Sequence, residues 1–282
     1  MKNYDLFDKK IVYNFNMGNG GIGDCIKFFM AILELCIRYK YKLYYQINNI
    51  PLEKYLRLKH AKMYISKEKM HGSAARMLRQ SVRSSVIYNI RKINSVTELQ
   101  HINNINYYIV VPEIFYSAFN YDSIGISIKD VFDFTDVVKS NSYSLLPSNI
   151  STYISLHLRL GDKYLETAKR FVIGSNDLRN YPEIVQKKLY DFIEENSNKN
   201  IIFFSDNNEY KKKLKEKYNN IVITNCNIGH TGLSNTTDKQ TLDAITEFYL
   251  MTKSEKIYCV THSGFSIVAS KFNNIPLINM YA

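Results

Sequence analysis

The stretch YISLHLRLGDKYLE, residues 153–166, decides the fold because it changes character halfway. Its start, Tyr153 to Leu156, is an alternating run typical of a β-strand that enters a core. The following residues then supply four polar side chains around a glycine: His157, Arg159, Asp162 and Lys163. In open parallel α/β sheets, ligands bind beyond the carboxyl ends of strands, so this pattern predicts a binding site.

The chemistry of this strand end favours an anion. His157 and Arg159 are two residues apart, so on a strand they share one face. The planar guanidinium of Arg159 suits two phosphate oxygens at once. The alternative is structural: Arg159 pairs with Asp162 across a turn, and His157 packs in the core.

The second half of the chain alternates strands and helices. Strand-like runs occupy 153–158, 201–205, 221–224, 257–261 and 276–279, and helical patterns occupy 181–196, 208–218, 241–253 and 264–272. This spacing predicts right-handed β-α-β units and a parallel sheet.

The first half begins in the same way. It shows a strand at 11–16, a glycine loop at 18–23, a helix at 25–38, and strands at 42–47 and 107–111. The polar stretch 139–151, which contains Pro147, suggests a linker. We therefore expect an α/β fold of two Rossmann-like domains facing across a cleft, an N-terminal domain of residues 1–145 and a C-terminal domain of residues 146–282.

The positive charge of the chain is concentrated in one region. Residues 53–92 hold eleven lysines and arginines against two glutamates, which is most of the net charge of +11 of the 282-residue chain. Arg76, Arg79 and Arg83 fall on one helical face. This region predicts contact with an acceptor or with an acidic surface such as a membrane. A basic nucleic-acid-binding protein is the alternative, although we expect no nucleic-acid partner.

The sequence lacks the usual signatures of metal sites and membrane spans. Its four cysteines have neither C-x-x-C nor zinc spacing, which is typical of free thiols in a reducing compartment. No apolar run approaches the roughly 18 residues of a membrane span. We expect a soluble, cytoplasmic protein that uses no divalent metal.

Three further polar clusters follow predicted strands. They are the glycine loop NMGNGGIGDC at 16–25, the residues after IIFFS at 206–207, and HSGFS at 262–266. Glycines allow a close backbone approach to a ligand, and the N-terminus of a helix favours negative charge. The alternatives are a tight strand-to-helix connection for the loop and simple helix caps for the other two. On the helix before the last cluster, Asp238, Asp243 and Glu247 could present a carboxylate, but a solvated face is the expectation.

These clusters together resemble a known family. His157-x-Arg159-x-x-Asp162 resembles the H-x-R-R-x-D signature of the α1,2-, α1,6- and protein-O-fucosyltransferase superfamily. GGIGDC at 20–25 is similar to its G-G-x-G-N-Q loop, and residues 263–266 are similar to its S-x-F-S element. The resemblance implies a GT-B fold, with a sugar-nucleotide donor on the C-terminal domain and the acceptor against the N-terminal domain.

The resemblance also implies roles for single residues. Arg159 would hold the β-phosphate, His157 and Asp206 would contact the nucleoside side, and Ser263 with Ser266 would line the diphosphate. The remaining donor-binding candidates are Gly21, Gly23, Asp162, Lys163, His262, Gly264 and Phe265. Arg76, Arg79 and Arg83 are expected on the acceptor side.

Two positions depart from the family pattern. The second arginine of the signature is Leu160, which weakens the inference of GDP-fucose as the donor. The loop asparagine is Asp24, as in heptosyltransferases, where that aspartate is the catalytic base. Asp24 and Glu166 both remain candidates for the base.

The predicted function is an inverting, metal-independent glycosyltransferase. Its donor would be a nucleoside-diphosphate sugar, GDP-fucose-like or UDP-linked, and its acceptor a hydroxyl of an oligosaccharide or glycoconjugate. An inactive sugar-nucleotide-binding module is the remaining alternative.

Overall fold

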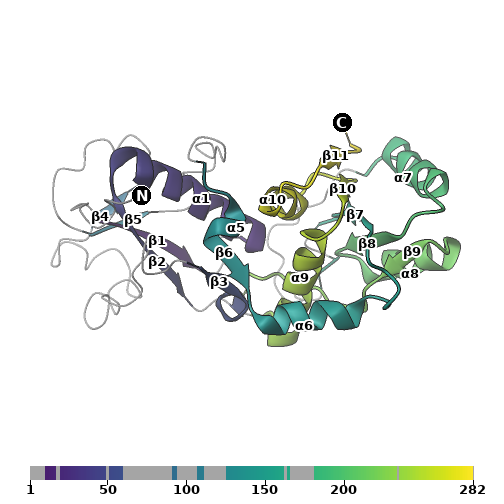
Figure 1. Cartoon of the computed structure of the whole chain (residues 1–282), viewed down its shortest axis with the longest axis horizontal. Helices are drawn as coiled ribbons and strands as arrows, with labels where there is room; N and C mark the ends of the chain where they lie inside the picture. Colours follow the sequence, from purple (N-terminus) through teal and green to yellow (C-terminus); the bar gives the residue numbers. More distant parts are fainter. Residues whose placement is uncertain are drawn as a thin grey trace. The chain divides into compact units, whose positions relative to one another are not determined.

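The computed structural model describes residues 10–16, 20–48, 51–59, 91–93, 107–110, 125–161, 164–165, 181–233 and 235–281. The chain forms two compact units. The first contains most residues before 134, and the second contains residues 134–282 together with two short earlier segments, 20–23 and 50–57. Figure 1 shows the elements in chain order.

The first unit contains a parallel sheet beside one long helix. The sheet order is β2 (Lys42–Asn48), β1 (Lys10–Asn16), β5 (Tyr107–Val110) and β4 (Arg91–Ile93). Helix α1 (Ile22–Tyr39) starts three residues before the predicted helix. The ring of Phe29 on α1 meets the ring of Tyr13 on β1 edge to face, at 5.3 Å between centroids. This aromatic contact helps to hold the helix on the sheet.

The second unit contains the predicted five-stranded parallel sheet. Its order is β11 (Leu277–Asn279), β10 (Lys256–Cys259), β7 (Ile154–Leu158), β8 (Ile201–Ser205) and β9 (Ile221–Ile223). Every residue of β7 and β8 is buried. Central strands of parallel sheets are covered on both faces, which explains the apolar sequence of β8 and the burial of the polar residues Ser155 and His157 in β7.

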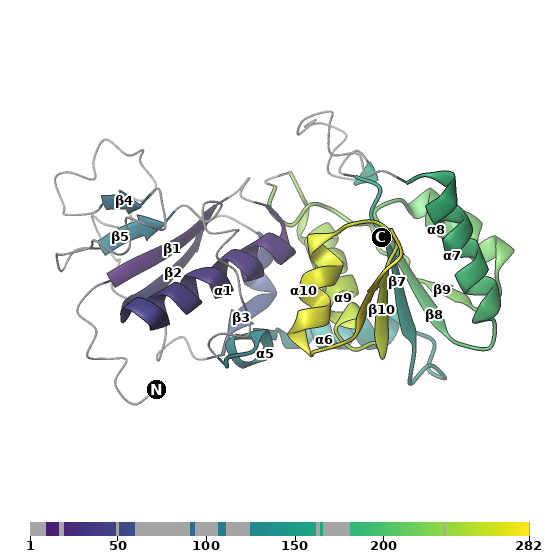
Figure 2. The same ribbon diagram turned by 90° about the horizontal axis from the view of Figure 1, so that it is seen from above.

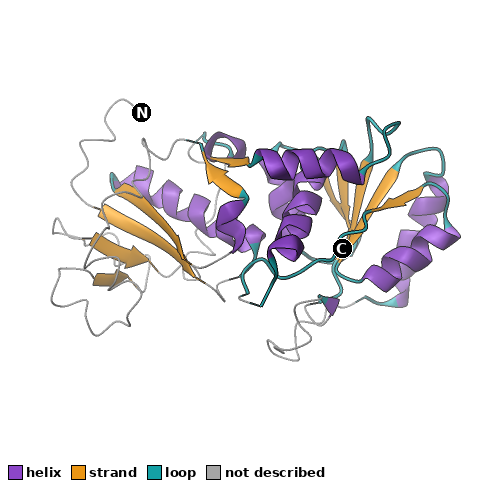
Figure 3. Ribbon diagram, turned by 90° about the horizontal axis from the view of Figure 1, so that it is seen from below, coloured by secondary structure: helices purple, strands orange, loops and turns teal. Residues whose placement is uncertain are grey.

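Helices cover both faces of this sheet (Figures 2 and 3). One face carries α7 (Glu183–Glu195) and α8 (Asn208–Lys217), and Leu189 and Leu214 of these helices pack with Leu156 of β7. The other face carries α9 (Asp238–Met251) and α10 (Gly264–Phe272). Because side chains alternate along a strand, His157 lies on the face opposite to Leu156.

The predicted linker is wrong in its first half. After η2 (Pro51–Lys54), β3 (Leu56–Leu58), α5 (Ile128–Val131) and β6 (Phe132–Phe134), the chain forms α6 (Asp136–Leu145). Val138 of α6 is buried, and Asn141 donates a hydrogen bond of 2.9 Å to the Thr246 hydroxyl on α9. Residues 139–145 therefore belong to a packed helix. The boundary between residues 145 and 146 stays a prediction.

Two further properties concern cysteines and membrane spans. All four cysteines lie within the described residues, where each is buried and unbridged. None of the described helices is both long and apolar enough to cross a membrane. The cellular compartment stays a prediction.

Candidate functional site

The candidate site lies at the carboxyl edge of the five-stranded sheet. Strands β10, β7 and β8 are neighbours, and His157 on β7 is in register with Cys259 on β10 and Phe204 on β8. Because the strands are parallel, the residues that follow them emerge at the same edge. The structure thus brings together the predicted clusters at 157–161, 206–207 and 262–266.

Asp206 organises the turn that follows β7. Its carboxylate accepts hydrogen bonds from the backbone amides of Leu160 at 2.8 Å and Gly161 at 2.7 Å. Its Oδ2 also lies 3.3 Å from Nη1 of Arg159. Gly161 has φ of 128°, a conformation that favours glycine. Asp206 therefore fixes both the backbone and the charged group of the turn.

The electrostatics of Asp206 reflect its position. Burial raises the pKa of its carboxyl, while Arg159 and the two amides act in the opposite direction. The residue of this cluster that caps a helix is Asn207, and not Asp206. The Asn207 side chain accepts the Tyr210 amide at 3.0 Å and caps α8. The nucleoside contact predicted for Asp206 stays a prediction.

Thr261 holds the backbone of Arg159 from the other side. Its hydroxyl accepts the Arg159 amide at 3.0 Å and donates to the Arg159 carbonyl at 2.5 Å. The Arg159 side chain is held by Asp206 and is 18% exposed, so it is not fully closed off from solvent. Sequence reasoning missed Thr261. The available signal is a hydroxyl residue at the end of the predicted strand 257–261.

His157 is buried beneath this edge as a neutral imidazole. Burial lowers the pKa of His157 to about 3, and the positive charge of Arg159 makes a smaller contribution in the same direction. Its Nδ1 is buried and finds no hydrogen-bond partner among the described residues. Its ring lies 5.6 Å from the ring of Phe265 on α10. The ring of His157 is thus packed in the core, as the structural alternative predicts. Its unpartnered Nδ1 would also fit a hydrogen bond to a ligand.

The start of α10 contains the predicted hydroxyl residues. Ser263 is the N-cap and accepts the Phe265 amide at 3.3 Å. Ser266 is fully buried, donates to the Ser263 carbonyl at 3.2 Å, and lies 3.0 Å from the Cys259 thiol. Capping is therefore confirmed for Ser263, and the diphosphate role of both serines stays a prediction. His262 is exposed and meets the Tyr281 ring edge to face at 5.9 Å.

The glycine loop packs by its backbone within the second unit. A Cβ at Gly23 would lie 2.9 Å from the Gly264 carbonyl oxygen, and one at Gly21 would lie 3.3 Å from the Thr231 hydroxyl. Glycine is therefore required for the close approach of the loop to the start of α10. The loop begins α1 at Ile22. The backbone at Gly23 thus lies beside the N-terminus of α10, and a helix N-terminus favours a negatively charged ligand.

Asp24 lies in the first turn of α1. It pairs with Lys27 at 2.9 Å, and its side chain is 39% exposed. The lysine partly offsets the negative charge of this carboxylate. Six other site candidates fall outside the described residues and stay predictions: Arg76, Arg79, Arg83, Asp162, Lys163 and Glu166.

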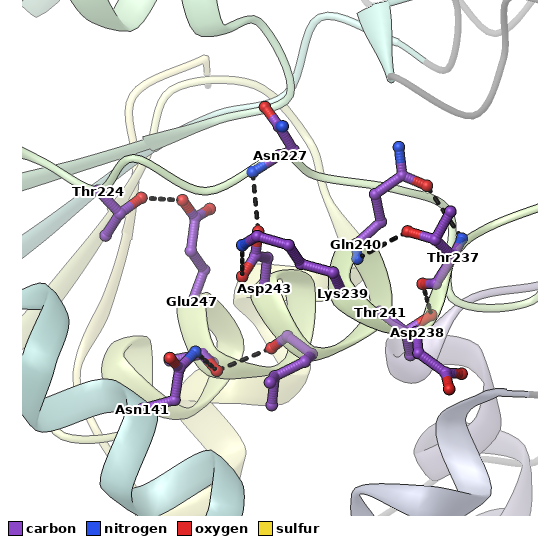
Figure 4. Close-up of polar contacts among 12 residues, drawn as sticks. Asn141, Thr224, Asn227, Thr237, Asp238, Lys239, Gln240, Thr241, Asp243 and Glu247 are labelled. Atoms are coloured by element: carbon purple, nitrogen blue, oxygen red, sulfur yellow. Dashed lines mark hydrogen bonds and ion pairs between the residues drawn. The ribbon is translucent and has the colours of Figure 1, made fainter.

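The solvated face predicted for α9 is wrong for two of its three carboxylates (Figure 4). Glu247 is buried, pairs with Lys211 of α8 at 2.9 Å, and accepts the Thr224 hydroxyl. Burial raises the pKa of Glu247, and Lys211 opposes this. Asp243 is also buried and accepts the Asn227 amide at 3.1 Å.

The third carboxylate, Asp238, is exposed and pairs with Lys54 at 2.6 Å. Among the residues that the structure describes, no three histidine, cysteine or acidic side chains are grouped so that they could hold a metal ion.

Solved fucosyltransferases share this fold. A mutant of FUT1 from Arabidopsis thaliana in complex with GDP matches 97% of this chain and 70% of its own, with a TM-score of 0.61 at 11% identity. NodZ from Bradyrhizobium matches 93% of this chain and 92% of its own, with a TM-score of 0.59 at 11% identity. POFUT1 in complex with GDP matches 98% and 99%, with a TM-score of 0.58 at 11% identity.

No protein-family model matches the sequence, and no curated protein matches it. The solved structures nevertheless confirm the predicted resemblance to fucosyltransferases as a likeness of fold over nearly the whole chain.

Proposed function

We propose that the protein is an inverting, metal-independent glycosyltransferase with a nucleoside-diphosphate sugar as donor. GDP-fucose is the first choice, because FUT1 and POFUT1 were solved with GDP and NodZ with GDP and GDP-fucose. The acceptor would be a hydroxyl of an oligosaccharide or glycoconjugate. The proposal includes a GT-B arrangement in which residues 146–282 bind the donor and residues 1–145 face the acceptor.

The observation that carries the proposal is the fixed position of Arg159. Asp206 holds its guanidinium, Thr261 holds its backbone, and the N-terminus of α10 begins just after Thr261. A guanidinium has five N–H donors, so Arg159 can contact Asp206 and phosphate oxygens together. Donors fixed before the reaction stabilise developing charge most effectively.

In the proposed reaction, the acceptor oxygen attacks the anomeric carbon as the bond to the diphosphate breaks. Arg159 and the amides at the start of α10 would stabilise the departing diphosphate, which makes a divalent metal unnecessary. Asp24 or Glu166 would accept the proton of the acceptor hydroxyl.

The first test is nucleotide binding in EDTA. We expect GDP to raise the melting temperature of the full chain, and UDP or ADP to raise it less. If none of the three nucleotides stabilises the protein, the glycosyltransferase proposal is rejected. Stabilisation without donor hydrolysis or transfer would instead favour the inactive binding module.

The second test replaces Arg159 by lysine. Arg159→Lys keeps the charge but loses the planar contact, so we expect transfer to fall by about 10²–10³-fold. The matched control is Arg38→Lys, because Arg38 is an arginine of α1 that is 56% exposed and pairs with Glu34. We expect the control to keep wild-type activity. Unchanged turnover in Arg159→Lys would exclude the phosphate role.

A further inference from the structure

The connection between β9 and α9 is anchored to α9 at both of its ends (Figure 4). At its start, Glu247 accepts the Thr224 hydroxyl and Asp243 accepts the Asn227 amide at 3.1 Å. At its end, Thr237 and Gln240 form a reciprocal capping box. The contact between Thr224 and Glu247 is buried, and a satisfied buried polar contact restricts the start of the loop.

The middle of the connection is a tight turn. The His230 carbonyl accepts the Leu233 amide at 3.0 Å and the Thr236 hydroxyl at 2.6 Å. The Gly232 amide donates to Nδ1 of His230 at 3.2 Å. These bonds hold the residue between them, Thr231, in a fixed place.

Thr231 contacts the start of α1. Its hydroxyl accepts the Ile22 amide at 2.9 Å, although the two residues are 209 positions apart. Both residues are buried, at 4% and 1% exposure. The first amides of a helix have no partner within the helix, and a buried donor without a partner is unfavourable. Thr231 therefore caps a helix that begins far away in the sequence.

The backbone of the turn fits the glycine loop closely. A Cβ at Gly232 would lie 1.9 Å from the Gly20 carbonyl oxygen, so only glycine allows this contact. Residues 20–23 and the whole turn belong to the second compact unit.

We propose that Thr231 is a positioning residue for the donor site. Its hydroxyl fixes the glycine loop beside α10 before a donor binds, so that binding does not have to order the loop. The inference rests on the proposed function and on the expectation that Gly21 and Gly23 of this loop contact the donor.

The test compares Thr231→Val, which removes the hydroxyl at nearly constant shape, with Thr231→Ser, which keeps it. The matched control is Thr241→Val. Thr241 is also buried, but its hydroxyl donates to the Thr237 carbonyl at the start of α9 and not to the glycine loop. We expect GDP to bind Thr231→Val about tenfold more weakly than wild type, the size of effect of one unsatisfied buried donor. Thr231→Ser and Thr241→Val should remain within about twofold of wild type.

Two results would overturn the inference: wild-type affinity in Thr231→Val, or an equal loss in Thr231→Ser, which would assign the effect to the methyl group. Hydrogen exchange of the Ile22 amide separates this inference from the proposed function. If wild-type protein binds no nucleotide, the donor site fails. In that case, faster exchange of the Ile22 amide in Thr231→Val than in wild type would still support the positioning of the loop by Thr231. Unchanged exchange of this amide would refute it.

Discussion

Acidification should destabilise the protein through His157. The folded pKa of this histidine is about 3, against an ordinary value of 6.5, because it is buried and lies beside Arg159. Between these values the unfolded chain binds a proton that the folded chain does not. The contribution of His157 to stability is therefore complete above about pH 6.5 and is lost as the pH falls towards 3.

The size of this effect follows from the pKa difference. A shift of about 3.5 units corresponds to roughly 5 kcal/mol in total, at 1.36 kcal/mol per unit. More than half of the interval between the two pKa values lies below pH 5. The loss of unfolding free energy between pH 7 and pH 5 is therefore only about 2 kcal/mol.

Urea unfolding of wild type and His157→Gln at pH 7 and pH 5 measures this contribution, because other groups titrate equally in both proteins. We expect wild type to lose about 2 kcal/mol more free energy of unfolding than the variant over this interval. His262→Gln is the control, since His262 is exposed, and it should follow wild type. If His157→Gln loses as much stability as wild type, the imidazole is not excluded from water and the reasoning fails.

Three further predictions concern carboxylates. Asp206→Asn should lower the free energy of unfolding by about 3 kcal/mol, measured in urea, because an amide cannot accept both backbone donors and leaves Arg159 without its counter-charge. Glu247→Gln should cost about 3–5 kcal/mol in the same assay by leaving Lys211 buried and unpaired, and adding Lys211→Met should recover part of the loss; no recovery would argue against the pair. Asp24→Asn should reduce transfer by about 10²–10⁴-fold with GDP affinity within about twofold; if it stays active while Glu166→Gln does not, Glu166 is the base.

The sheet and the place of the site could be predicted because both depend on local patterns. The alternating run of β7 and the apolar run of β8 identify strands, and polar residues directly after them must emerge at the carboxyl edge of a parallel sheet. The start of α9 was also readable, because Thr237 and Gln240 have the spacing of a capping box. The helical pattern alone predicts a start at Thr241, three residues after the observed start at Asp238.

The errors come from partners that are distant in the sequence. Glu247 reads as a solvated helix residue, since Lys211 is 36 positions away on another helix. Thr231 carries no local signal at all, because its partner Ile22 is in the first turn of α1. Residues 139–145 of α6 read as a linker because only Val138 and Ser142 of this helix are buried, which leaves a weak apolar pattern.

The burial of every cysteine has a practical consequence for labelling. Burial raises the pKa of Cys25, Cys36, Cys226 and Cys259, and the thiolate is the form that reacts with maleimides. The folded protein should therefore resist such reagents without any change to its native cysteines. A cysteine introduced at Tyr143, whose side chain is 79% exposed, would then take up a single dye on α6.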